Sequence, residues 1–114
     1  MAVENAIIDK VTLSMEDHGC LTYFVFFNLA KGGHAGIGGY CIGHGYLGAD
    51  HFDGSAKGLE AMMRIMDTVG VEKWENLEGK YIRVETDGWG SRIHKIGNII
   101  EDKWFDEEEF FSKE

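Results

Sequence analysis

The chain has 114 residues, a length typical of one domain, and its 44% hydrophobic residues are enough for an ordinary core. Its longest apolar stretch, around residues 23–27, is far shorter than the roughly 20 residues of a membrane helix, so we expect no membrane span. The net charge of −9 repels phosphate backbones and argues against direct nucleic-acid binding. A basic surface on a partner protein is the natural complement.

The first half of the chain shows the patterns of three antiparallel strands. Residues 6–16 alternate apolar and polar side chains with one exception, Asp9, and the apolar set is Ile7, Val11, Leu13 and Met15. Residues 21–29 carry aromatic and aliphatic side chains on both parities, which is typical of a central strand. Residues 34–42 predict a third strand, although its glycines weaken it unless a bulge or a close backbone contact requires them.

Residues 43–54 are glycine-rich and aperiodic, which predicts a surface loop. The glycines do not form a phosphate-binding pattern, because no Gly-Lys-Ser/Thr ends the loop and Asp50 and Asp53 precede the next helix. Turns and bulges are the better explanation for them.

The same loop and its flank gather four residues that could bind a metal or act as nucleophile and base: Cys41, His44, His51 and Asp53. A Cys-x-x-His spacing can place two ligands on one zinc ion, and a histidine can take a proton from a thiol. No second pair completes a four-ligand set, so we expect no bound metal or other cofactor. A small metal- or thiol-dependent enzyme stays the alternative function.

The clearest helix lies between Ser55, a good N-cap residue, and Gly70, which can adopt the left-handed conformation that ends a helix. Apolar residues recur at helical spacing, and we expect this stripe to pack on the sheet as core rather than to form an adaptable binding surface: Leu59, Met62, Met63, Met66 and Val69. In particular, we expect Leu59, Met63 and Met66 to be buried against the sheet.

Residues 71–77 predict a short helical turn held by Trp74 and Leu77. Residues 81–86 and 93–100 then predict a hairpin that turns at residues 87–90. The sequence therefore predicts an α+β fold for residues 1–114: an antiparallel sheet of about five strands in the order β-β-β-α-β-β, with one amphipathic helix packed on one face.

The tail, residues 101–114, holds seven acidic residues against two lysines, a net charge of −5 out of the chain's −9. Within it a run of four acids interrupts four large aromatics, two on each side: Trp104, Phe105, Asp106, Glu107, Glu108, Glu109, Phe110 and Phe111. Such a segment either docks its aromatics on its own domain or presents them to a basic groove of a partner, where the carboxylates would steer association. We take these eight residues as the candidate partner-binding site and keep docking as the alternative.

The first five residues lack the basic and apolar regions of an export signal, so the sequence predicts a cytoplasmic protein. In that reducing compartment Cys20 and Cys41 are expected to be separate thiols. The sequence does not determine the oligomeric state, and a homo-oligomer stays among the alternatives.

Residues 38–41 (GGYC), 58–60 (GLE), 69–80 (VGVEKWENLEGK) and 96–105 (IGNIIEDKWF) resemble small acidic proteins encoded by bacteriophages and prophages. Some proteins of that kind inhibit host defence, including anti-CRISPR proteins. The resemblance implies a phage origin and the cytoplasm of the host cell. With the charge, it predicts a non-enzymatic inhibitor that occupies a basic, nucleic-acid-handling surface of a host protein.

Overall fold

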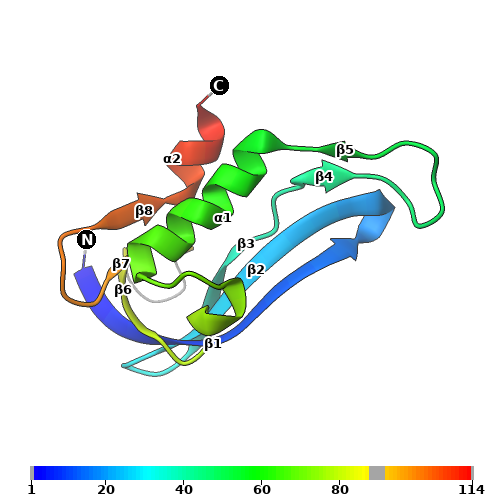
Figure 1. The fold of residues 1–114 in the computed structure, drawn as a ribbon. Coiled ribbons are helices and arrows are strands. Elements are labelled where there is room, and N and C mark those ends of the chain that lie inside the picture. The colour runs from blue at the N-terminus through cyan, green and yellow to red at the C-terminus, as the bar shows by residue number, and fades with distance from the viewer. Residues whose placement is uncertain (1, 88–91, 114) are drawn as a thin grey trace.

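The computed structural model describes residues 2–87 and 92–113, and the predicted turn at 87–90 falls largely outside them. Within these residues eight strands form one curled antiparallel sheet, with the longer helix α1 (Ala56–Val69) lying across its concave side (Figure 1). The α+β class and the antiparallel sheet are confirmed, with more strands than the five expected. The additional strands are short ones, in the segment 43–54 and in the tail.

The sheet runs β5-β4-β2-β1-β6-β7-β8, and β3 pairs with β2 beside β4. Its long strands are β1 (Ala2–Glu16) and β2 (Cys20–Leu29), joined by a 3-10 turn at Asp17–Gly19. The remaining strands are β3 (His34–Gly38), β4 (Gly43–His44), β5 (Asp53–Gly54), β6 (Tyr81–Thr86), β7 (Lys95–Asn98) and β8 (Trp104–Asp106). A 3-10 turn at Trp74–Leu77 matches the predicted one, and a short helix α2 (Glu107–Ser112) follows β8.

Asp9 forms a β-bulge in β1, because Ile8 pairs with Phe27 while Lys10 pairs with Phe26. The extra residue exchanges the parity of the core-facing side chains. Before the bulge the buried ones are Ala6 and Ile8, and Ile7 lies on the other face. After it Val11, Leu13 and Met15 share the core side, but Leu13 and Met15 remain exposed. The single face predicted for residues 6–16 is therefore wrong before Asp9.

Both predicted ends of α1 are confirmed. The Ser55 side chain accepts a hydrogen bond from the Gly58 N–H, and Gly70 is left-handed, its N–H donating to the Met66 carbonyl. The buried face differs from the predicted stripe and consists of Gly58, Ala61, Met62, Ile65 and Thr68.

Leu59 and Met63 are 59% and 66% exposed, so the prediction that they are buried is wrong, whereas Met66 is partly buried. The reason is close packing by small residues. A Cβ at Gly58 would overlap the Ile42 side chain, so the helix approaches the sheet through Gly58 and Ala61, and the larger residues beside them turn outward.

Candidate functional site

The tail that we expected to bind a partner is an integral part of the sheet. β8 pairs with β7, placing Phe105 opposite Ile96 and Trp104 opposite Gly97. Asp106 then caps α2, because its carboxylate accepts a hydrogen bond from the Glu109 N–H at 3.0 Å. The segment 104–112 is thus ordered by backbone pairing and a cap.

The tail aromatics dock on their own domain, as the alternative reading proposed. Phe105 is 5% exposed and belongs to the core, and Phe110 and Phe111 are half-buried against it. The Phe111 ring stacks on Tyr40 with centroids 4.1 Å apart, and Phe110 lies 5.5 Å from Phe105. Most of the apolar surface that was to anchor a partner is therefore used internally.

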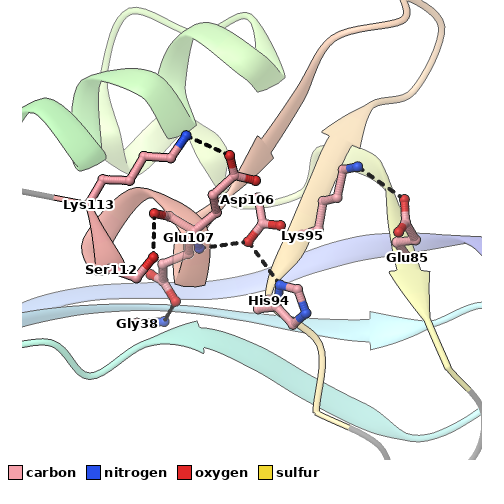
Figure 2. Close-up of polar contacts among 9 residues, drawn as sticks. Gly38, Glu85, His94, Lys95, Asp106, Glu107, Ser112 and Lys113 are labelled. Atoms are coloured by element: carbon pink, nitrogen blue, oxygen red, sulfur yellow. Dashed lines mark hydrogen bonds and ion pairs between the residues drawn. The ribbon is translucent and has the colours of Figure 1, made fainter.

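Glu107 is the least expected residue of the tail, because it is only 1% exposed. Its carboxylate accepts a hydrogen bond from the Tyr23 hydroxyl and another, at 3.0 Å, from the Gly38 N–H. Figure 2 shows it reaching from α2 to Gly38 at the end of β3. Glu107 thereby joins the segment after β8 to β2 and β3 on the opposite side of the curled sheet. We predicted that Glu107 contacts a partner, but its carboxylate is buried inside its own domain.

Burial raises the pKa of Glu107, and the hydrogen bonds from Tyr23 and Gly38 only partly oppose this. Burial and the nearby Glu107 carboxylate also raise the pKa of Tyr23. The neighbouring Asp106 behaves differently: burial would raise its pKa, but hydrogen bonds from the Glu109 N–H and from His94, 2.9 Å away, lower it (Figure 2). Two adjacent acids thus serve two structural roles, a buried tie and a helix cap.

Two acids of the predicted set remain open to solvent, Glu108 and Glu109. Lys113 pairs with Glu109 at 2.8 Å, and the other lysine of the tail, Lys103, pairs with Asp67 at 3.0 Å. Among the described residues the Glu108 carboxylate has no ion pair or hydrogen bond. The tail therefore keeps an acidic surface while both of its lysines are engaged within the chain.

The Cys41 loop does not assemble the metal or thiol site considered above. Cys41 is joined to Cys20 by a disulfide, with the Cα atoms 5.2 Å apart, so the prediction of separate thiols is wrong. This separation lies within the roughly 4.4–6.8 Å that a disulfide spans, and the chain beside Cys41 is held against β2 because the Ile42 N–H donates to the Leu21 carbonyl at 2.8 Å. In this state the Cys41 sulfur is neither a free nucleophile nor a thiolate ligand.

The other three residues of that loop lie at the surface. His51 pairs with Asp53 at 2.9 Å, and both side chains are highly exposed. His44 lies opposite Asp53 across β4 and β5, with its ring 6.2 Å from that of Tyr46. Within residues 2–87 and 92–113 no group of three or more His, Cys, Asp or Glu side chains is placed to hold a metal ion.

The same end of the molecule exposes several large apolar side chains, which the sequence reading missed. They are Leu13, Met15, Tyr46, Leu47 and Phe52. Two of them alternate in β1 as core residues would, and the others lie in a segment read as an ordinary glycine-rich loop. The available signal was the presence of Tyr, Leu and Phe in a loop that needed none of them for a turn.

No helix in the described part of the chain is long and apolar enough to cross a membrane. Comparison with protein-family models, with curated proteins and with solved structures finds no match to this chain.

Proposed function

We propose that this chain is a non-enzymatic binding protein whose acidic surface occupies a basic surface of a partner protein, one that otherwise handles nucleic acid. The sequence resemblance to phage-encoded acidic proteins suggests a host defence protein as that partner and an anti-CRISPR-like inhibitor as the biological role. Occupying such a surface would block the nucleic acid by direct competition, because both ligands present dense negative charge.

The observation that carries this proposal is the rigid, unbalanced charge of the tail. Glu108 is exposed on a capped helix and has no ion pair among the described residues. Glu109 beside it is exposed and pairs with Lys113, and Lys103 pairs with Asp67, so neither tail lysine neutralises Glu108. Acids held on an ordered element lose less conformational entropy on binding than acids on a free tail. The arrangement therefore favours a preformed electrostatic contact.

The disulfide weighs against the alternative of a thiol- or metal-dependent enzyme, because that mechanism requires a free Cys41 sulfur. The remaining candidates, His44, His51 and Asp53, provide one exposed His–Asp pair and no oriented nucleophile among the described residues.

The test is affinity capture from a bacterial host lysate at increasing salt, with the captured proteins identified by mass spectrometry and then assayed as purified proteins. We expect a basic nucleic-acid-binding protein whose association slows in Glu108→Gln/Glu109→Gln and whose nucleic acid competes with this chain. The matched control is Glu72→Gln/Glu75→Gln, which removes two exposed acids elsewhere. Capture that is insensitive to salt and to the tail substitutions would refute the proposal.

A further inference from the structure

The strand β3 lies at an edge of the sheet. It pairs with β2 on one side, and no strand within residues 2–87 and 92–113 pairs with it on the other. It carries neither lysine nor proline, two residues that often protect an exposed edge. Its outer side therefore offers backbone hydrogen-bonding groups to a further strand.

The hydrogen-bond pattern identifies which backbone groups are open. In an antiparallel pair, successive residues alternately bond to the neighbouring strand and point away from it. The Gly39 N–H donates to the Tyr23 carbonyl at 3.0 Å, so within β3 the odd-numbered residues bond to β2. The even-numbered residues His34, Gly36 and Gly38 therefore direct their N–H and C=O groups away from β2.

Gly36 is the open centre of this edge. The Gly38 N–H is already engaged, because it donates to the Glu107 carboxylate at 3.0 Å (Figure 2). Gly36 is exposed, and in the described part of the chain its outward N–H and C=O have no hydrogen-bond partner. Such groups are complementary to the backbone of another extended chain, which can exchange hydrogen bonds with them.

Two aromatic side chains form an apolar groove beside Gly36. Phe24 and Phe26 lie on the face of β2 opposite to the core, and their rings stack with centroids 5.3 Å apart. A Cβ added to Gly36 would lie 3.0 Å from the Phe26 ring, so this ring leans over β3. The groove has a volume of about 390 Å³, and both rings, His34, Gly36 and Arg92 line it. An added strand could therefore place an apolar side chain on the Phe rings.

Arg92 is the only lysine, arginine, aspartate or glutamate among the described residues that line this groove. Its side chain is exposed beside the Tyr40 hydroxyl, and no ion pair within the described residues holds it. The nearby Glu107 carboxylate is buried and bonded to Tyr23 and Gly38. Physiological salt screens charges more than about 8 Å apart, so a ligand carboxylate can pair with Arg92 although the chain is acidic as a whole.

We propose that the open edge of β3 binds an extended peptide segment of another protein as an added strand, with an apolar side chain over Phe24 and Phe26 and a carboxylate at Arg92. This surface goes beyond the proposed function, because it recognises an acidic and apolar segment rather than a basic one. It does not use the carboxylates of Glu108 and Glu109, so either proposal can fail without the other.

A second copy of this chain is not the expected occupant. Two-fold pairing of two β3 strands about Gly36 would place His34 opposite the second copy's Gly38, whose N–H is engaged by Glu107. The strand β3 also contains no acid that could pair with Arg92. A strand with an acidic side chain satisfies both the backbone and the charge.

The probe is a short fluorescein-labelled peptide in which valine and glutamate alternate. One comparison peptide carries lysine in place of each glutamate, and another has the probe sequence with every backbone nitrogen methylated. Binding is measured by fluorescence anisotropy at physiological salt. The test variants are Phe26→Ser and Arg92→Gln, and the matched controls are Phe52→Ser and Arg64→Gln, which change exposed residues outside the groove. Melting temperatures of all proteins are compared first.

We expect each test variant to weaken binding of the probe about tenfold, because anchors in a groove carry most of the affinity. The controls should bind as the parent does, and the lysine and methylated peptides should bind at least tenfold more weakly. Hydrogen exchange followed by NMR should show the Gly36 N–H becoming protected when the probe is added. If Phe26→Ser melts below the parent, Arg92→Gln and the exchange at Gly36 decide the question.

Four results would overturn the inference: no binding of the probe, equal binding of the methylated peptide, equal affinity of Arg92→Gln and Arg64→Gln, or unchanged exchange at Gly36. Sedimentation equilibrium supplies a fifth. A dimer of the parent that the probe dissociates would assign the edge of β3 to a second copy of the chain.

Discussion

Substitution of Glu107 tests whether a single buried carboxylate closes the curled sheet. Glu107→Ala leaves the Tyr23 hydroxyl and the Gly38 N–H without an acceptor, and each unsatisfied buried donor costs about 1–3 kcal/mol. Because Gly38 is only partly buried, we expect a total loss of about 2–4 kcal/mol in the free energy of unfolding. At roughly 4 °C per kcal/mol this lowers the melting temperature by about 10 °C.

Glu107→Gln should be far milder at neutral pH. The amide oxygen can accept from Gly38 and the amide nitrogen can donate to the Tyr23 oxygen, while no charge is buried. The matched control is Glu108→Ala, which removes an exposed neighbour and should change stability by no more than about 0.5 kcal/mol.

The difference in the free energy of unfolding between the parent and Glu107→Gln should change with pH in a direction that the pKa of Glu107 determines. Burial raises the folded-state pKa of Glu107 above its ordinary value of 4.5. At a pH between 4.5 and the folded-state pKa, the folded state therefore binds more protons than the unfolded state. Lowering the pH through this window should therefore stabilise the parent relative to Glu107→Gln, and the gain should level off below 4.5.

The assay is urea denaturation followed by circular dichroism between pH 4 and pH 8 on all four proteins. Subtracting the free energy of unfolding of Glu107→Gln from that of the parent at each pH removes the contribution of the other carboxylates, including Asp106 with its lowered pKa. Two results would refute the reasoning: a Glu107→Ala melting temperature equal to that of the parent, or a difference between parent and Glu107→Gln that does not change with pH.

Three further predictions concern the helix, the disulfide and the cap. Met63→Asp should fold and melt within about 0.5 kcal/mol of the parent because that side chain is exposed, whereas Met62→Asp should lose cooperative melting because it buries an unpaired charge. Reducing Cys20–Cys41, which closes a loop of 21 residues, should cost about 3 kcal/mol in urea denaturation, and a Cys41→Ser protein should then be insensitive to reductant. Asp106→Ala should cost about 1 kcal/mol through loss of the α2 cap, and a calorimetric melting temperature equal to the parent's would contradict that.

Local signals predicted the elements whose ends depend on local chemistry. Ser55 and Gly70 define α1 because a hydroxyl cap and a left-handed glycine act within one turn. The hairpin strands were found because alternation and turn residues are also local properties. The α+β class followed from these elements.

The errors came from interactions between distant segments. The bulge at Asp9 is visible only once β1 is paired with β2, and the buried face of α1 depends on Ile42 lying against Gly58. A hydrophobic scale favours Leu59 and Met63 over Gly58 and Ala61, although small residues allow the closest approach. Glu107 could not be separated from Glu108 and Glu109, since all three suit the first turn of a helix.

The tie between Glu107 and Tyr23 spans 84 residues of sequence, and β1 pairs with β6 across a similar distance. Forming a contact between residues so far apart in sequence costs the conformational entropy of closing a large loop before the contact stabilises the chain. The domain should therefore fold more slowly than a helical protein of its size. During synthesis the β1–β2 hairpin leaves the ribosome before β6, so the other edge of β1 at Ala2–Ile7 is unpaired until Tyr81–Thr86 follows. Until residue 107 emerges, the edge of β3 at Gly38 stays open to other unpaired strands.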